Sequence, residues 1–330
     1  MRWIDKQVAQ ALAASLANRT TIQYNGQCNQ FLMFVFWTRG AEPFLPASDT
    51  LLCQYLVWQS RTVEPRNLGG YLSAIRNLHL SLGLPWVDLR DRFMVGWVVK
   101  GLKRLIGGQI RRKLAITPEL LVRMRKCPGI DWKSPRMKAV WAVMLLAFFT
   151  ISRKDNFTVD KVNAFNARKN LTRGDVKVLQ SGIHCTFRRS KGNQFGERAH
   201  QVVALAAPGR ILDPKAAVEE AFSLGQRNRA TDPAFLVPGP SGWVPLTHSV
   251  FVGSLKHCLV QIGVDPGGYS GHSFRRGGAT YAHRLGIDPL LIKRMGDWLS
   301  DAYMVYIDPN TPERLVALPA AMIRACALLG

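Results

Sequence analysis

The sequence predicts a mainly α-helical protein with one small antiparallel β-sheet, an α+β fold divided into two domains. Apolar residues recur at helical spacing along most of the chain, whereas residues 173–205 alternate between apolar and polar as short strands do. The length of 330 residues is typical of two domains. With 47% hydrophobic and 20% charged residues, the composition is that of a globular protein and excludes a disordered or fibrous chain.

Residues 1–105 are expected to form an all-helical domain. Helical periodicity covers 20–39, 51–60, 67–82 and 92–105, and strand signals are nearly absent from this part of the sequence. In the first helix Tyr24, Cys28, Phe31 and Val35 fall on one face. Asp49 and Thr50 stand where an N-cap of the second helix is needed.

Residues 106–116 are expected to link this domain to the next. Gly107 and Gly108 interrupt the helical pattern, and the basic triplet Arg111-Arg112-Lys113 follows them. Such a segment suits a flexible linker lying along phosphates, or else a solvated loop. Thr117 as N-cap and Pro118 at the first helical position then begin a new helix.

Residues 117–330 mix helices with the strands of the sheet. Three strands are expected at 175–179, 183–189 and 200–205, with turns at Ser181-Gly182 and Gly192-Asn193. The thirteen apolar residues from Ala139 to Ile151 are too few to span a membrane and indicate a buried core helix. Helices are expected at 118–126, 136–150, 214–224, 247–262, 273–285, 289–296 and 312–328, the last apolar along one face.

The charge of the chain points to a polyanionic partner. Lys and Arg number 44 against 22 Asp and Glu, a net charge of +22. Residues 1–113 carry +9 of it and the remainder +13, so both domains are expected to contact the ligand. Nucleic acid is the first candidate and an acidic membrane surface the second. The N-terminus lacks the unbroken apolar stretch of a signal peptide, and the six cysteines show no CxxC spacing, which indicates reduced thiols in an intracellular protein without a metal site.

The strongest local motif is SGHSFRRGGATYAHRLG at 270–286. His272 and Arg275 stand i, i+3 at a helix start, which places an imidazole and a guanidinium on one face beside the positive end of the helix dipole. Together they form an anion site with a group able to carry a proton. Arg276 points about 100° away, toward a second phosphate. The alternative is a capped surface helix with solvated side chains.

Four further residues have functional and structural interpretations. In RMGDWLSDAYMVYIDP at 294–309, Tyr303 or Tyr306 is either a nucleophile in a basic setting or a core aromatic. Arg153 follows the apolar helix, where a buried charge must be paired or functional. Lys191 lies in the turn of a hairpin, a place from which a lysine can reach a ligand. Taken singly, each basic residue also fits an ion pair or an exposed charge.

In combination these residues resemble the tyrosine recombinase (phage integrase-like) family of DNA-breaking and rejoining enzymes. The resemblance covers the whole chain and is most specific over 270–308. TISRKDN and SKGNQFGER are most similar to the recombinases of eukaryotic tyrosine-recombinase retroelements. The N-terminal part resembles the family's core-binding domain, and 117–330 its catalytic domain. The catalytic residues carried over are, in chain order, Arg153, Lys191, His272, Arg275, Trp298 and Tyr306.

The resemblance implies a role for each of these residues. Tyr306 would attack the scissile phosphate and form a 3′-phosphotyrosyl link, with Arg153 and Arg275 on the non-bridging oxygens. His272 would handle the tyrosine proton and Lys191 would protonate the departing 5′-hydroxyl. Trp298 would donate its indole N–H to the phosphate. Neither a metal nor ATP would be needed, because the arginines neutralise the charge and the phosphotyrosine stores the bond energy.

Two departures from the family pattern accompany the resemblance. Asn156 stands where an acidic residue often follows the first arginine by three places, which leaves the adjacent Asp155 as its substitute. Tyr306 follows Trp298 by eight residues instead of the common nine, and Tyr303 is the alternative nucleophile. His257 and His283 are not among the positions carried over from the family pattern and are interpreted as structural.

The expected partners are double-stranded DNA and further copies of the chain. DNA would be held as in a C-shaped clamp, with four protomers at a synapse, monomers or dimers when free, and the last helix docked on a neighbouring protomer. The alternatives are a non-catalytic DNA-binding protein and a type IB topoisomerase-like enzyme. The compartment would be nuclear in a eukaryote and cytoplasmic otherwise. The residues expected to contact DNA are Arg111, Arg112, Lys113, Lys103, Arg104 and Arg276.

Overall fold

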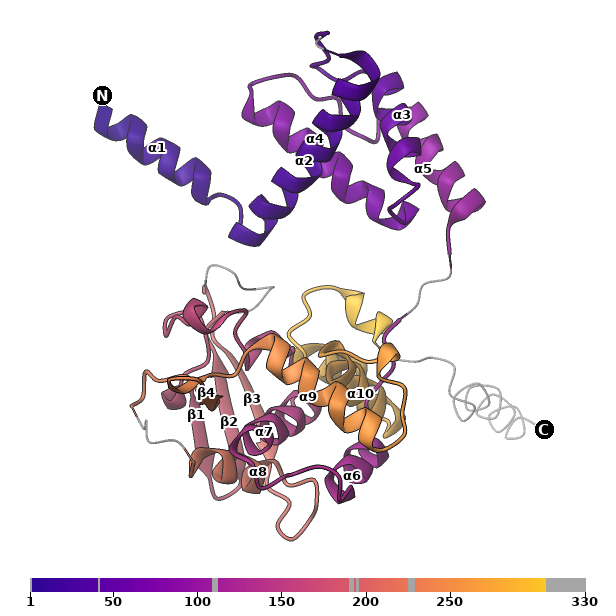
Figure 1. Ribbon diagram of the computed structural model, residues 1–330. Coiled ribbons are helices and arrows are strands. Elements are labelled where there is room, and N and C mark those ends of the chain that lie inside the picture. Colours follow the sequence, from indigo (N-terminus) through magenta and orange to yellow (C-terminus); the bar gives the residue numbers. More distant parts are fainter. Residues whose placement is uncertain are drawn as a thin grey trace, which may run out of the picture. The chain divides into compact units, whose positions relative to one another are not determined.

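The computed structural model describes residues 2–40, 42–108, 112–189, 193, 196–224 and 229–306 (Figure 1). The chain divides into two compact units, Met1–Arg111 and Arg112–Gly330. This boundary lies within residues 106–116, which were expected to form a linker. Lys191, Arg111 and the helix expected at 312–328 lie outside the described residues.

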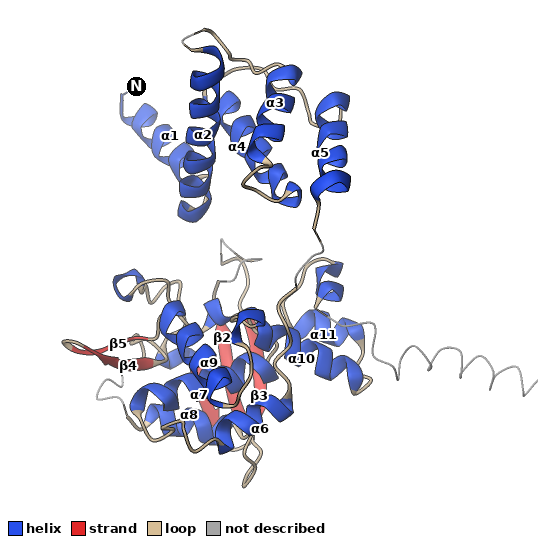
Figure 2. Ribbon diagram, turned by 45° about the vertical axis from the view of Figure 1, so that its right-hand side comes forward, coloured by secondary structure: helices blue, strands red, loops and turns tan. Residues whose placement is uncertain are grey.

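The described part of the first unit consists of helices joined by loops and contains no strand, as predicted (Figure 2). Its four expected helices are present, with the second capped by Ser48 instead of Asp49 or Thr50. A helix at the N-terminus was not expected. Phe31, Tyr55 and Leu56 are fully buried in its core, whereas Leu32 is exposed. The helices are α1 (Arg2–Ala14), α2 (Asn18–Arg39), α3 (Asp49–Gln59), α4 (Leu68–Ser81) and α5 (Phe93–Ile106).

The second unit combines helices with a three-stranded antiparallel sheet in the order β1-β2-β3, formed by Val176–Leu179, Gly182–Phe187 and His200–Leu205. A second hairpin of β4 (Leu236–Gly239) and β5 (Gly242–Pro245) corrects the expectation of a single sheet. The sequence LVPGPSGWVP hides these strands, because prolines and glycines in it indicate a loop. The helices are α6 (Pro118–Lys126), α7 (Pro135–Phe149), α8 (Pro214–Phe222), α9 (His248–Gln261), α10 (His272–Arg284) and α11 (Pro289–Met295).

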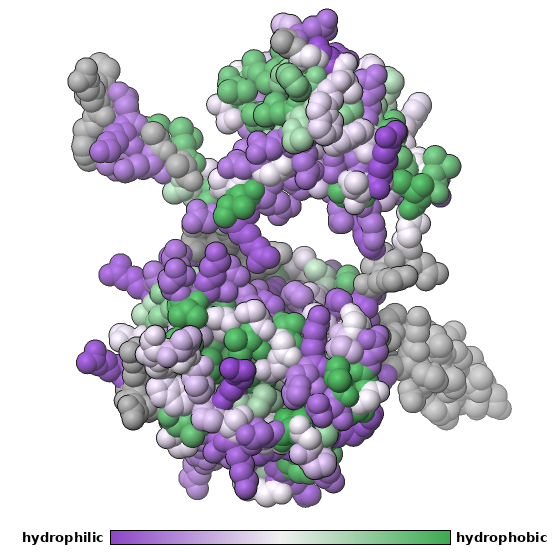
Figure 3. All heavy atoms as spheres, in the orientation of Figure 1, coloured by the Kyte–Doolittle hydropathy of each residue, from purple (hydrophilic) through white to green (hydrophobic). Residues whose placement is uncertain are grey.

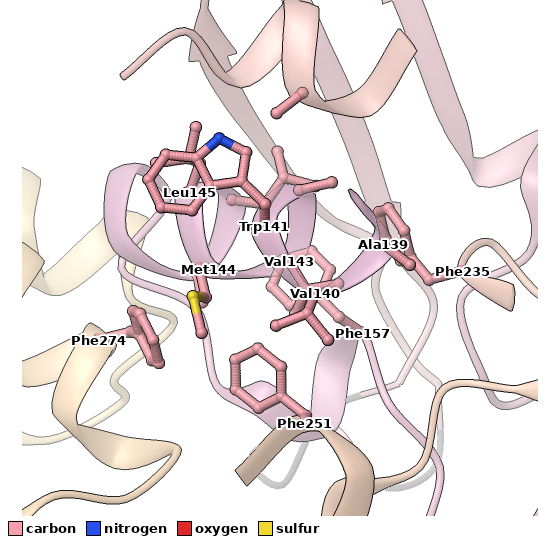
Figure 4. Packing of buried hydrophobic residues seen from close by; sticks show 14 of the residues in the cluster. Ala139, Val140, Trp141, Val143, Met144, Leu145, Phe157, Phe235, Phe251 and Phe274 are labelled. Carbon is pink, nitrogen blue, oxygen red and sulfur yellow. The ribbon is translucent and has the colours of Figure 1, made fainter. Parts of the chain in front are cut away.

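The core of the second unit forms around α7, the helix expected from the apolar run. Every residue of α7 from Ala139 to Phe148 is buried. Trp141 and Leu145 extend to one side of it, and Met144 faces Phe251 and Phe274 on the other (Figure 4). Because α8, α9, α10 and β4 all contact α7, an apolar face is needed all round it, which explains why its sequence shows no polar stripe.

Two adjacent glycines let α10 approach the segments around it closely. A Cβ on Gly277 would lie 1.8 Å from the carbonyl oxygen of Ile116, and one on Gly278 would lie 2.1 Å from that of Phe148. Any larger residue would force α10 away from the end of α7. The double glycine of the 270–286 motif is therefore a packing device that brings the start of α10 next to the residues that follow α7.

Hydrophilic residues cover most of the visible face of the second unit, with apolar residues scattered among them (Figure 3). Within the described ranges, no helix is long and apolar enough to cross a membrane. Nor do three or more His, Cys, Asp or Glu side chains gather there in an arrangement that could hold a metal ion.

Candidate active site

Arg153 is placed by a strained turn at the end of α7. Ile151 adopts a φ of 53°, a left-handed conformation that is costly for a β-branched residue. The turn follows the helix directly, and Arg153 after it is partly buried. Its Nη1 atom is buried and has no hydrogen-bond partner among the described residues. The strained turn and the buried Nη1 atom without a described partner make Arg153 a candidate ligand-binding residue.

Arg275 lies in the first turns of α10 and is almost fully buried, with 1% of its surface exposed. Its Nη1 donates a hydrogen bond of 3.1 Å to the carbonyl oxygen of Ile151. The guanidinium carbon lies 3.6 Å from the centre of the Trp298 ring, in cation–π contact. Burial, followed by the charge of Arg153, lowers the pKa of Arg275 to about 9, which leaves it charged at neutral pH.

The two arginines form a candidate anion site. Neither forms an ion pair with a carboxylate among the described residues, although the charge of Asp297 is near enough to act on Arg275. Nε and Nη2 of Arg275 are buried and, like Nη1 of Arg153, bond to no described residue. Each guanidinium carries donors arranged for bidentate contact with phosphate. Two like charges close to each other away from water are costly unless an anion binds between them. The geometry therefore favours a phosphate-sized anion.

Tyr306 lies beside this anion site. Its ring centre is 5.5 Å from the Arg275 guanidinium carbon and 5.3 Å from the Trp298 ring. The ring is only partly buried. Tyr303, by contrast, is 5% exposed and packs in a small apolar cluster with Trp298, Ile151 and Ile292. The structure therefore brings Tyr306 to the arginines and assigns Tyr303 to the packing beneath them.

The segment that carries Tyr306 is a short 3-10 helix, Asp301–Val305, held to two α-helices. Lys293 of α11 donates to Asp301 at 2.8 Å. From α10, the Thr280 hydroxyl donates to the carbonyl oxygen of Tyr306 at 2.9 Å, and Nη1 of Arg276 donates to that of Val305 at 3.3 Å. No role was expected for Thr280 from its place in the sequence.

His272 is exposed at the first position of α10, on the same helix as Arg275. Neighbouring protein atoms remove part of the water around the His272 imidazole, and this desolvation lowers its pKa. The charge of Asp155 opposes this shift, and nearby cations add to it. A lowered pKa keeps the imidazole neutral at pH 7, the form that can accept a proton.

Asp155 does not orient Arg153, contrary to the expectation that it substitutes for the acidic residue of the family pattern. Its carboxylate bonds to Lys154 and lies 3.4 Å from Nε2 of His248. Burial raises the pKa of Asp155, but Lys154, His248 and His272 outweigh burial and hold it below the ordinary value. No local sequence signal points to His248, because it lies about ninety residues away, at the start of α9.

Trp298 is positioned by a second left-handed turn. Asp297, which precedes it, has a φ of 55°, and its buried carboxylate bonds to Arg198. A Cβ on Gly296 would lie 1.8 Å from the Trp298 ring, so the indole needs glycine at that position. The ring is 8% exposed and forms the floor beneath Arg275 and Tyr306.

The residues expected to contact DNA fall into two groups. In the second unit Arg112, Lys113 and Arg276 line a surface hollow of about 330 Å³, together with Arg284, which the sequence analysis did not name. In the first unit, Lys103 and Arg104 are exposed in the last turn of α5. The four basic side chains of the hollow form a positive surface on the linker side of α10.

Solved structures are similar to this chain, whereas comparisons of its sequence with family models and curated proteins find no match. The XerH site-specific recombinase bound to palindromic difH substrate is 12% identical with a TM-score of 0.64, covering 92% of this chain and 79% of that one. The Tn1549 transposon integrase in complex with transposon right end DNA is 11% identical with a TM-score of 0.63, covering 97% and 98%.

A lambda integrase dimer bound to a core site is 13% identical with a TM-score of 0.53, covering 94% of this chain and 96% of that one. At such identities the likeness concerns the fold. This chain aligns with the Tn1549 and lambda integrase structures over nearly its whole length. It has helices around a small antiparallel sheet and brings Arg153, Arg275 and Tyr306 together. This chain therefore shares its fold with these recombinase and integrase structures.

Proposed function

We propose that this protein is a site-specific DNA recombinase or integrase that cleaves and rejoins DNA through a 3′-phosphotyrosyl intermediate. One observation carries the proposal: Tyr306 lies next to the buried guanidinium of Arg275, which is itself near Arg153. Both guanidiniums have donors that lack a hydrogen-bond partner among the described residues. A phosphodiester in this site would place its non-bridging oxygens on the arginines and its phosphorus within reach of a phenol.

Each step of the reaction has a residue to perform it. The Tyr306 oxygen would form a bond to phosphorus while the bond to the 5′-oxygen breaks, with the phenol proton passing to neutral His272. The charge that develops on the phosphate would be met by Arg153 and Arg275. Lys191 remains our proposal for the group that protonates the 5′-oxygen. Attack by a 5′-hydroxyl on the phosphotyrosine would then rejoin the strands.

The structure favours a structural role for Trp298 beside the hydrogen bond expected of its indole. The centre of its ring lies 3.6 Å from the Arg275 guanidinium carbon, and the ring also packs against that of Tyr306. Trp298 would therefore fix the distance between the arginine and the nucleophile. The partners that we propose are duplex DNA, held partly by Arg112, Lys113 and Arg276, and three further copies of the chain at a synapse. We also propose that the protein recombines the DNA of a mobile element, because TISRKDN and SKGNQFGER resemble segments of retroelement recombinases.

A nicked suicide substrate tests the proposal. Duplexes selected from a random library by binding to Tyr306→Phe would be rebuilt with a nick beside the cleavage site, so that the released fragment diffuses away. The parent protein should then accumulate a covalent protein–DNA band, and Tyr306→Phe should bind equally well without forming it. DNA binding by the parent without any adduct would indicate a non-catalytic DNA-binding protein. Relaxation of any supercoiled plasmid by the monomer would indicate a topoisomerase.

A further inference from the structure

We infer that Thr280 is a positioning residue for the nucleophile Tyr306 and that Arg276 contributes more weakly to the same positioning. Helix α10 would thereby fix both the groups that bind the phosphate and the backbone of the nucleophile. This inference rests on the proposed function. The Thr280 side chain is 6% exposed, and its hydroxyl donates to the carbonyl oxygen of Tyr306 itself. Arg276 donates to the preceding carbonyl, that of Val305. Two consecutive carbonyls of the tyrosine segment are thus bonded to one helix.

The same helix carries the groups that would hold the phosphate. His272 and Arg275 lie in its first turns, Arg276 follows directly, and Thr280 comes one turn later. Because an α-helix is rigid over two turns, the distance between the phosphate ligands and the backbone of Tyr306 is set within a single element. Sites on such elements hold catalytic geometry more closely than sites on loops do, and small misplacements cost rate.

The rest of the segment is anchored independently of Thr280. Tyr303 is buried, the N–H of Tyr306 donates to the Tyr303 carbonyl oxygen at 2.8 Å, and Lys293 bonds to Asp301. Loss of the Thr280 bond should therefore leave the segment folded but release the carbonyl end of Tyr306. The expected defect is one of aim: the phenol spends less time in line with the phosphorus.

Thr280→Val tests the inference, because valine keeps the shape of threonine and lacks the hydroxyl. In single-turnover cleavage at saturating DNA, its rate constant should fall about tenfold, equivalent to about 1.4 kcal/mol. The amplitude, the Kd for DNA, the melting temperature and the shape of the pH profile should stay close to those of the parent. Thr280→Ser, which restores the hydroxyl, should be within about twofold of the parent.

Thr38→Val is the matched control. The Thr38 hydroxyl donates at 2.8 Å to the carbonyl oxygen of Phe34 within its own helix in the first unit, so the same substitution there should leave the rate unchanged. Arg276 is less suitable for the test, since its loss should also weaken DNA binding.

Each other outcome overturns the inference. A parent-like rate in Thr280→Val, when the parent forms its adduct, refutes the inference alone. A lower amplitude and melting temperature with an unchanged rate constant would show a merely structural role. An equally slow Thr280→Ser would show that packing matters and the hydroxyl does not. Absence of an adduct in the parent would overturn the proposed function and this inference together.

Discussion

Replacing Arg275 by methionine should make the second unit more stable while it abolishes strand cleavage. Methionine is similar in length and apolar, so it can fill the space that the arginine occupies. In the parent, a cation is 99% removed from solvent beside a second cation, and two of its nitrogens have no described partner. Such a site is arranged for a ligand and not for stability.

The magnitude follows from the contacts of Arg275. Two unsatisfied buried donors cost about 1–3 kcal/mol each, so their removal should gain roughly 4 kcal/mol. The cation–π contact with Trp298 offsets about 1–2 kcal/mol of this gain, and the bond to the Ile151 carbonyl about 1.5 kcal/mol. The net gain in free energy of unfolding is about 1 kcal/mol, or an increase of about 3 °C in Tm for a unit of this size.

Thermal unfolding of the parent and of two variants checks this reasoning. Arg173 supplies the matched control, because its guanidinium carbon also lies 3.6 Å from an aromatic ring centre, that of Phe222, but its nitrogens donate to the carbonyl oxygens of Phe222 and Ala234. Arg173→Met should lower Tm. If Arg275→Met lowers Tm by as much as Arg173→Met, the Arg275 charge is compensated in the free protein and the reasoning fails.

An added anion gives a second measurement of the same site. Inorganic phosphate that binds the folded state at both arginines should raise the Tm of the parent with increasing concentration. The same additions should raise the Tm of Arg275→Met much less. An equal increase in both proteins would show that phosphate stabilises the unit elsewhere.

Three further predictions concern pH, packing and salt. The pKa of His272 is lowered, so the acid limb of the cleavage-rate profile should lie below pH 6.5. Asp155→Asn should move this limb to still lower pH, because the carboxylate of Asp155 favours the imidazolium, and an upward shift would contradict this. Gly278→Ala should lower the free energy of unfolding by at least about 2 kcal/mol, whereas Gly253→Ala, with open space around it, should change it by less than about 1 kcal/mol in chemical denaturation. Lys113→Ala should weaken binding to all duplexes and reduce the slope of log K against log salt by about 1; an unchanged slope would place this lysine away from DNA.

Most elements of the fold are predictable from local sequence. The cap at Thr117 and Pro118 locates the start of α6, and helical periodicity locates α7 to within one residue. The β4–β5 hairpin is not predictable in this way. Its prolines and glycines are poor strand formers, and its pairing becomes favourable only when α7 packs against it.

The candidate site is predictable in composition but not in arrangement. The chemistry of Arg153, Arg275 and Tyr306 is visible in their motifs, and the structure brings them together. The turns that aim them are not visible, because Ile151 in a left-handed conformation contradicts its own local preference. Nor is the distant His248 beside Asp155, since only tertiary packing joins residues so far apart in sequence.

Mapping the covalent adduct to a single tyrosine tests the central claim most directly. After cleavage of a suicide substrate, the complex would be digested with protease and nuclease. Peptide mass spectrometry should then find a nucleotide linked through its 3′-phosphate to Tyr306, and none at Tyr303. A modified Tyr303, a modified residue elsewhere, or no modified peptide from a preparation that binds DNA would contradict the claim that Tyr306 and the two arginines act on one phosphodiester.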